Sequence, residues 1–219
     1  MDTKRSAALT GAIVVAMVAA SALLYPRLPE TMVTHWGASG DPNGTMSRLW
    51  GAFFVPALTA GVAALLYAVP KVDPRRENYA AFRPLYDEFV VVLTAFLALT
   101  HGLTLAVNLG FDVPLTATVF AGVGLLLIYV GRLLGAADRN WFVGIRTPWT
   151  LSDETVWQRT HEIGATLFKL SGLLAVVGAF VPTYGVYLVL GPVVASALFL
   201  VAYSYYLYER RDGDGSVAP

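Results

Sequence analysis

Histidines at positions 35, 101 and 161 are the side chains of this sequence best suited to acid–base or metal chemistry. His35 has two carboxylates near it in the sequence, Glu30 and Asp41, and one histidine with two carboxylates can ligate a divalent metal. The spacing of the three matches no recognised ligand pattern, so we expect no metal and no cofactor here. His35, Trp36 and Asp41 are interpreted either as a surface that contacts a ligand or as part of an ordered loop that caps the fold.

His161 belongs to a second informative segment, residues 136–164, in which tryptophans lie beside arginines. Such a composition is typical of side chains that anchor helices at membrane headgroups. Gly144, Arg146 and Pro148 are crowded into the same short stretch, and an anchor alone does not require them. We therefore favour a folded docking element over a plain anchor, and we expect Arg146 to close it onto a carbonyl or carboxylate acceptor.

The second half of this segment carries helix signals. Pro148 disfavours a helix that continues from upstream, and residues 150–153 (Thr-Leu-Ser-Asp) resemble a capping box with Ser152 as a competing N-cap. A helix is predicted to begin there and to continue past Trp157 and His161. These two residues are four positions apart, so they share one face of that helix.

Enzyme chemistry finds little support in the sequence. There is no cysteine, which excludes disulfides, thiolate metal sites and a cysteine nucleophile. No His-Glu-x-x-His motif is present. Asp153 and His161 would lie about two turns apart on a helix, too far to touch. We therefore predict that the protein is not an enzyme.

Two ionisable residues, His101 and Lys169, fall inside long apolar stretches. Ionisable residues are costly in a bilayer and are functional candidates there. The long side chain of Lys169 can reach the interface, whereas His101 is expected to stay neutral and to hydrogen-bond a neighbouring helix. No Asp or Glu lies inside any apolar block to extend a proton relay. Secondary transporters usually carry paired buried charges, which are missing here, so a small secondary transporter or permease is kept only as the alternative function.

The elements that must position these residues are apolar blocks. The sequence is 56% hydrophobic and 14% charged, whereas a soluble domain is typically about a quarter charged. Each block is a continuous apolar run long enough to cross a bilayer as a helix. We predict an all-α integral membrane protein of one domain, residues 1–219. Its six transmembrane helices are predicted at residues 7–25, 49–69, 89–109, 115–134, 163–181 and 185–207.

Basic residues set the predicted orientation. Twelve lysines and arginines fall at the termini and in the second and fourth connections, while only Arg27 and Arg48 fall in the first. By the positive-inside rule both termini are cytoplasmic, residues 26–48 form an outer loop and residues 135–162 form a cytoplasmic loop. Residues 41–44 (Asp-Pro-Asn-Gly) of the outer loop predict a tight turn. The 15 basic and 15 acidic residues balance, so nucleic acid is not an expected partner.

The two loops resemble the two signatures of the Sdp-immunity (SdpI) family. One signature belongs to a small domain of unknown function and follows the pattern LP-x5-HW-x3-G-x-P. It falls on Leu28, Pro29, His35, Trp36, Gly40 and Pro42. The other, N-x3-GIRT-x-WTL-x4-VW-x3-H, is the more specific. It falls on Asn140, Gly144, Ile145, Arg146, Thr147, Trp149, Thr150, Leu151, Val156, Trp157 and His161.

The resemblance covers nearly the whole chain and implies a multi-pass plasma-membrane protein. The founding member of the family protects a bacterium from its own secreted killing peptide and holds a transcriptional repressor at the membrane. Resistance and signal transduction by binding are therefore implied, with three kinds of partner: membrane lipid, a toxin peptide at the outer face and a cytoplasmic regulator such as a repressor. The oligomeric state is left open. The predicted contact residues are His35, Trp36, Asp41, Asn140, Gly144, Arg146, Thr147, Trp149, Thr150, Trp157 and His161.

Overall fold

The computed structural model describes residues 1–37, 40–181 and 183–213, with side chains as far as residue 211. Within these residues the chain forms six long helices, one short helix and a two-stranded hairpin. The helices are α1 (Thr3–Leu24), α2 (Arg48–Val72), α3 (Tyr79–Asn108), α4 (Leu115–Leu134), α5 (Pro148–Ser152), α6 (Glu154–Gly178) and α7 (Gly185–Gly213). The strands are β1 (Thr31–Trp36) and β2 (Pro42–Ser47), and short 3-10 turns cover Tyr25–Arg27 and Arg76–Asn78.

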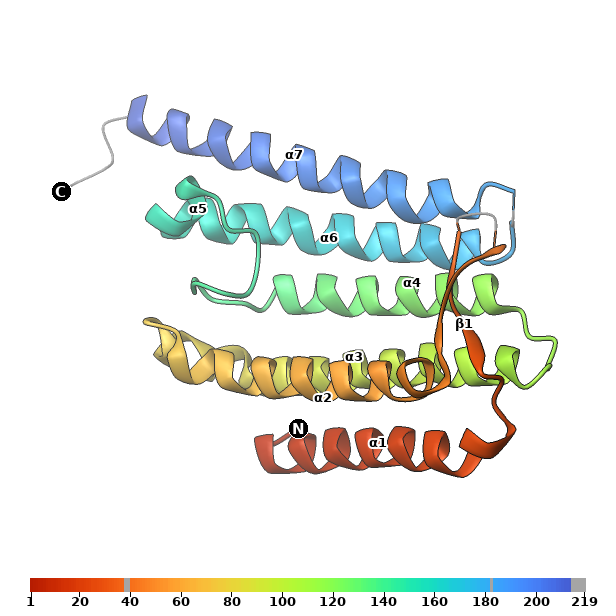
Figure 1. Ribbon diagram of the computed structural model, residues 1–219. Coiled ribbons are helices and arrows are strands. Elements are labelled where there is room, and N and C mark those ends of the chain that lie inside the picture. Colours follow the sequence, from red (N-terminus) through yellow and green to blue (C-terminus); the bar gives the residue numbers. More distant parts are fainter. Residues whose placement is uncertain (38–39, 182, 214–219) are drawn as a thin grey trace.

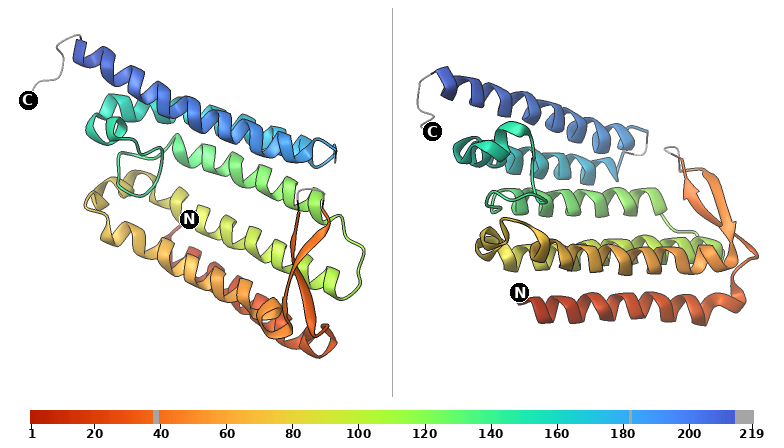
Figure 2. Two further views of the ribbon diagram at one scale, coloured as in Figure 1. Left: turned by 45° about the horizontal axis from the view of Figure 1, so that its top comes forward. Right: turned by 60° about the vertical axis from the view of Figure 1, so that its left-hand side comes forward.

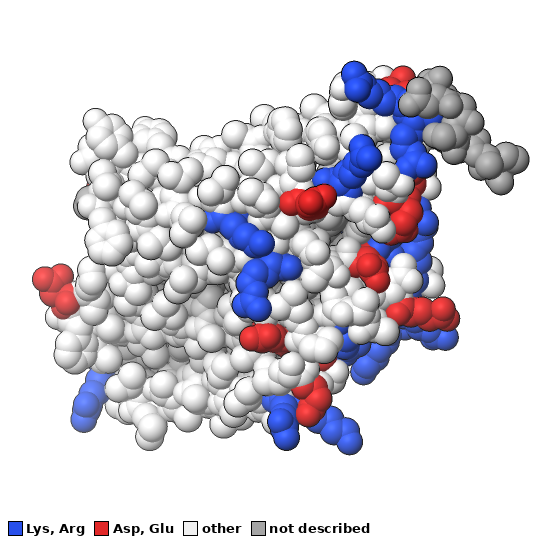
Figure 3. All heavy atoms as spheres, turned by 180° about the vertical axis from the view of Figure 1, so that it is seen from behind, with Lys and Arg blue, Asp and Glu red and all other residues white. Residues whose placement is uncertain are grey.

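The long helices lie side by side in a row that runs from α1 through α2 and α3 to α4, α6 and α7 (Figure 1). The start of α1, the end of α7 and the short α5 lie at one end of the bundle, and the hairpin lies across the other (Figures 1 and 2). These are the loop end and the hairpin end. On the face shown in Figure 3, charged side chains gather toward the loop end, and most of the remaining surface is uncharged.

Five helices in the described part of the chain, α1 to α4 and α7, are long and apolar enough to cross a membrane. α6 is not among them because charged residues interrupt its sequence, including Glu162 and Lys169. The prediction of a helical membrane protein is therefore confirmed in outline, and the hairpin is an exception to its all-α character. Six crossings, and the side on which the termini lie, stay predictions.

α3 and α6 begin well before the predicted blocks at residues 89 and 163. In α3 the added turns are amphipathic: Tyr79, Phe82 and Tyr86 are buried on one face, in a cluster that includes Val90. A search for continuous apolar runs misses such a segment because its polar face interrupts the run. α6 also ends earlier than predicted, at Gly178.

α4 and α6 approach each other backbone to backbone. A Cβ added at Gly124 of α4 would lie 2.6 Å from the carbonyl oxygen of Gly172 of α6, and one added at Gly131 would lie 2.7 Å from that of Ala165. Small residues at helix interfaces permit this closeness and let van der Waals contacts hold helices together in lipid. The seam fixes α6, which carries much of the loop motif, against α4.

The hairpin pairs Thr31 with Ser47 at its base, and its register is irregular around His35, which lies opposite Gly44. The predicted turn at residues 41–44 is wrong, because Pro42 to Gly44 belong to β2. The chain reverses earlier, where the amide of Gly37 donates to the carbonyl of Asp41 over 2.9 Å. Gly44 serves close approach instead, since an added Cβ would lie 2.9 Å from the Cβ of His35.

Candidate functional site

The α4–α6 loop (residues 135–153, including α5) folds around Asn140, which is completely buried. Its Oδ1 accepts the backbone N–H groups of Phe142 over 2.9 Å and Val143 over 2.6 Å, together with the hydroxyl of Tyr79 from α3 over 3.2 Å. Its Nδ2 donates to two loop carbonyls, each at 2.9 Å. The amide of Asn140 is therefore used to shape the loop, and it is not presented to a partner.

The loop backbone then passes directly over the ring of His161. Gly144 has a φ of +120°, and an added Cβ would lie 2.3 Å from His161 Nε2. The next amide, from Ile145, donates to that Nε2 over 2.9 Å. His161 Nδ1 donates to the carbonyl of Trp157 over 2.8 Å. The imidazole of His161 also stacks on the indole of Trp157, with 3.9 Å between the ring centroids. Trp157 in turn donates its ring N–H to the carbonyl of Ala137 over 2.8 Å.

This arrangement fixes the protonation state of His161. The side chain is 2% exposed and lies near the start of α6, before the apolar half of that helix. Burial lowers the pKa of His161 to about 4. The hydrogen bond to the carbonyl of Trp157 raises this pKa, but the effect of burial is the larger one. The neutral ring carries its proton on Nδ1 and leaves Nε2 as the acceptor for Ile145. A second proton on Nε2 would face the Ile145 N–H and break this contact.

Two caps start the helices of this region. Thr147 and Thr150 form a reciprocal capping box at α5, where each side chain accepts the backbone N–H of the other over 3.2 and 2.9 Å. Asp153 caps α6 by accepting the N–H of Val156 over 2.8 Å. The predicted capping box at residues 150–153, with Ser152 as N-cap, is therefore wrong. A separate turn of helix, α5, intervenes, and Ser152 is its last residue.

Further contacts fasten the loop to α7. The hydroxyls of Thr147 and Ser204 lie 3.1 Å apart in a buried position. The ring of Trp149 packs on that of Tyr205 with 5.0 Å between centroids. The predicted helix through Trp157 therefore starts from a loop that α3, α6 and α7 all hold.

Arg146 lies on the exposed side of the same loop. Its Nη1 donates to the carbonyl of Trp141 over 2.7 Å, so the expected closure onto a carbonyl is present. Trp141 and Phe142 are each 44% exposed beside it. These three residues form the exposed corner of the loop, which a partner can reach.

Sequence analysis missed Asp73, which is 2% exposed in the turn after α2. One carboxylate oxygen accepts the hydroxyl of Tyr79 over 3.0 Å and the backbone N–H of Trp141 over 2.9 Å. The other accepts the N–H of Arg75 over 2.7 Å. This connection drew attention only for its basic residues. The Asp-Pro dipeptide at residues 73–74 is a turn signal that identifies the position.

At the opposite end, the motif side chains of the hairpin face outward. His35 and Asp41 are exposed, and Trp36 is half-buried. His35 Nδ1 hydrogen-bonds the side-chain oxygen of Asn43, its neighbour on β2. Among the described residues no group of three or more His, Cys, Asp or Glu side chains is placed to hold a metal.

The hairpin is nevertheless held firmly on the bundle. Asn108, at the end of α3, accepts the N–H of Val33 and donates to its carbonyl, both over 2.8 Å. Met32 is fully buried against Gly51 of α2, where an added Cβ would lie 2.8 Å from its sulfur. The exposed side chains therefore stand on a fixed platform.

Within the bundle His101 is 2% exposed and makes the expected contact with a neighbouring helix. Its Nε2 lies 2.8 Å from the hydroxyl of Ser21 on α1, and Ser21 donates to the carbonyl of Ala52 on α2 over 2.6 Å. His101 therefore donates to Ser21, and one polar chain joins α1, α2 and α3. Lys169 is exposed on the surface of α6.

One carboxylate of α3 is buried, in the turns that precede the predicted block. Asp87 is 1% exposed and pairs with Arg83 one turn earlier over 2.9 Å. It also accepts a hydrogen bond from the hydroxyl of Thr3 of α1. Asp87 lies in the amphipathic start of α3 toward the loop end, so it belongs to the packing of α1 on α3.

Comparison with known proteins finds matches to both loops. Residues 12–60 match a domain of unknown function, DUF1648, and residues 136–204 match the SdpI/YfhL protein family. Immunity protein SdpI of Bacillus subtilis (strain 168) is 27% identical over 194 residues, which cover 88% of this chain and 91% of that protein. No solved structure matches. The predicted resemblance is thereby confirmed, and the chain is a multi-pass plasma-membrane protein in which a segment that matches the SdpI/YfhL family follows one that matches DUF1648.

Proposed function

We propose that the protein gives its cell immunity to a secreted antimicrobial peptide, and that it acts by binding. The observation that carries the proposal is the hairpin. It presents an exposed histidine, His35, and an exposed carboxylate, Asp41, on a platform that Asn108 fixes to α3. A recognition surface that is already ordered loses little conformational entropy when a ligand binds.

The similarity to an immunity protein over most of both chains supports the same function. Binding is favoured over catalysis by the state of the buried His161. Both of its ring nitrogens are engaged in hydrogen bonds, so neither is available as a general base.

In this proposal six helices cross the membrane, and the hairpin faces the outside. An even number of crossings accords with the start of α1 and the end of α7, which lie at one end of the bundle (Figure 1). The exposed corner of Trp141, Phe142 and Arg146 then faces the cytoplasm, where it is the surface for a regulator such as a repressor. Signal transduction would join the two surfaces through α3, which contacts both the hairpin and the α4–α6 loop.

Cysteine labelling tests this orientation, because the natural chain has no cysteine. The two variants are Asp41→Cys on the hairpin and Gln158→Cys on α6, because both positions are exposed. A membrane-impermeant maleimide should label Asp41→Cys in intact cells and Gln158→Cys only after permeabilisation. The reverse pattern, or labelling of both in intact cells, would contradict the orientation.

Survival tests the function directly. The chain is expressed in Bacillus subtilis that lacks its own SdpI, and the cells are challenged with spent medium of the parent strain. We expect at least tenfold more survivors than with an empty vector at the same membrane load. Equal killing, with the protein present and folded in the membrane, would refute the proposed protection. Proton-coupled solute uptake in liposomes without protection would establish the alternative, a small transporter.

A further inference from the structure

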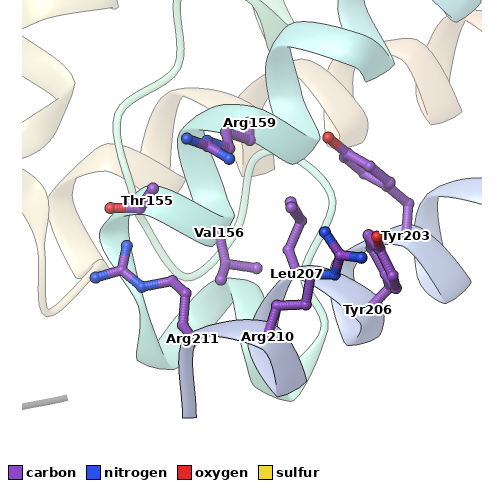
Figure 4. Close-up of a pocket in the computed structure, with 8 residues that line it drawn as sticks. All are labelled: Thr155, Val156, Arg159, Tyr203, Tyr206, Leu207, Arg210 and Arg211. Carbon is purple, nitrogen blue, oxygen red and sulfur yellow. The ribbon is translucent and has the colours of Figure 1, made fainter. Parts of the chain in front are cut away.

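A groove follows one side of the seam between α6 and α7, and its character changes along its length. At the loop end it opens into a cleft of about 490 Å³. The lining residues of this cleft, shown in Figure 4, are Thr155, Val156, Arg159, Tyr203, Tyr206, Leu207, Arg210 and Arg211. Three arginines and two tyrosines therefore surround an apolar floor.

The groove continues toward the hairpin end through two more hollows that share residues with one another. A second hollow of about 490 Å³ shares Arg159 and Tyr203 with the cleft and reaches Leu167. A third, of about 340 Å³, begins between Leu167 and Phe199 and ends between Leu174 and Pro192. Its lining is apolar except for two serine hydroxyls, and these already accept or donate within the bundle.

The charges at the arginine end are positioned for an anionic guest. Arg159 of α6 and Arg210 of α7 form no ion pair with any side chain that the structure describes. Arg210 lies over the ring of Tyr206 at 4.7 Å, which holds the guanidinium at the rim. Arg211 pairs with Asp153 over 3.3 Å and so fixes the end of α7 to the start of α6. The nearest acidic lining residue is the exposed Glu162, in the second hollow.

The length of the groove matches one membrane leaflet. From Arg159 to Leu174 α6 rises roughly 22 Å at 1.5 Å per residue. Half of a bilayer with its headgroups is also roughly 20–22 Å. A guest with a phosphate at Arg159 and Arg210 would therefore have its tail beside Leu174 and Pro192 at the depth of the leaflet centre.

We infer that this groove binds one anionic phospholipid, with its phosphate between Arg159 and Arg210 and an acyl chain along the α6–α7 seam. Charge complementarity selects the headgroup, since arginine donates paired hydrogen bonds to phosphate oxygens. The apolar end selects a lipid over a free phosphate, because inorganic phosphate leaves the hollow between Leu167 and Leu174 empty. The inference does not rest on the immunity function.

The test is lipid binding to the purified, delipidated full chain, measured by native mass spectrometry with phosphatidylglycerol. We expect one tightly retained phosphatidylglycerol, at least tenfold weaker retention of phosphatidylcholine and at least tenfold weaker retention of phosphatidylglycerol in Arg159→Gln with Arg210→Gln. Lys71→Gln with Arg76→Gln removes the same charge from exposed positions at the same end, and it should bind as the parent does.

Two further arms identify the guest. Ala195→Trp fills the apolar hollow and should weaken phosphatidylglycerol retention while both arginines remain. Millimolar inorganic phosphate should not displace the lipid. Equal retention of the two phospholipids, equal losses in both charge variants, or displacement by phosphate alone would overturn the inference. Circular dichroism of each variant confirms that a loss of lipid does not reflect a loss of fold.

Discussion

The hairpin and the α4–α6 loop occupy opposite ends of the bundle, and their motif residues are disposed in opposite ways. Asn140 of the loop and Trp157 and His161 of α6 beneath it are each at most 2% exposed and are satisfied by hydrogen bonds within the protein. In the hairpin, His35 and Asp41 are exposed. A buried, satisfied polar group stabilises one fold, whereas an exposed polar group on a fixed platform is available to a ligand.

A sequence motif therefore need not be a contact surface. Much of the loop motif forms a buried network that places one corner, Trp141 to Arg146, at the surface. If this comparison is right, substitutions in the buried network reduce stability first and function as a consequence. Substitutions on the hairpin should reduce function and leave stability nearly unchanged.

Gly144→Ala should have the largest effect. The added methyl group would meet His161 Nε2 at 2.3 Å on a backbone with φ +120°, so both the contact and the backbone become strained. We expect a loss of about 3 kcal/mol or more in the free energy of unfolding, measured as thermal unfolding in detergent. Gly102→Ala is the matched control, because nothing lies within 4 Å of its added Cβ. An unchanged melting temperature for Gly144→Ala would remove the basis for calling this network structural.

Acidification should weaken the same network through His161. Its pKa falls from 6.5 in the unfolded chain to about 4 in the fold, so between these values only the unfolded state takes up the proton. The contribution of the neutral His161 to the free energy of unfolding is complete above about pH 6.5, falls as the pH drops and is lost at about pH 4. It amounts to at most about 3 kcal/mol. His161→Gln, which cannot take up this proton, should show a smaller loss of melting temperature between pH 7.5 and pH 5. Equal slopes for the two proteins would contradict the buried neutral histidine.

The caps should give a smaller and more local effect. Thr147→Ala and Asp153→Ala each remove a side chain that accepts a helix N–H, and each should cost about 1–2 kcal/mol. Ser152→Ala is the control at a neighbouring position, where the exposed hydroxyl only donates to a carbonyl one turn earlier. Its thermal unfolding should match that of the parent. A larger loss for Ser152→Ala than for Thr147→Ala would restore the capping box predicted from the sequence.

The wrong prediction of a capping box at residues 150–153 shows what local sequence patterns can and cannot determine. Continuous apolar runs located the core of every long helix, because a bilayer demands about twenty apolar residues. They missed the amphipathic start of α3 around Tyr79, where only one face is buried. The patterns Thr-Pro-Trp-Thr and Thr-Leu-Ser-Asp overlap in the sequence, and the Thr147 of the first also contacts Ser204 of α7, which a local pattern does not contain.

The hairpin was missed for a related reason. Asn43-Gly44 favours a turn locally, but in the structure Gly44 lies opposite His35 in the paired strands. A glycine is needed at this position because the strands leave no room for a Cβ there. Likewise, which motif residues are buried depends on Tyr79 and Asp73, which are distant in sequence and meet the loop only in the folded chain. The motif spacing marks residues of this region, but it does not show which way their side chains face.

His35→Ala should have the smallest effect on stability and a large effect on function. The side chain is exposed, and its bond to Asn43 is one surface hydrogen bond, so we expect a change of less than about 0.5 kcal/mol in the free energy of unfolding. If the hairpin is the recognition surface, survival in the peptide challenge should fall at least tenfold at equal membrane abundance. Thr45 is likewise exposed but lies on β2 and outside the motif, so Thr45→Ala should protect as the parent does. Full protection by His35→Ala and by Asp41→Asn would move recognition away from the hairpin. Loss of melting temperature together with protection would show instead that this end, like the loop, is a structural network.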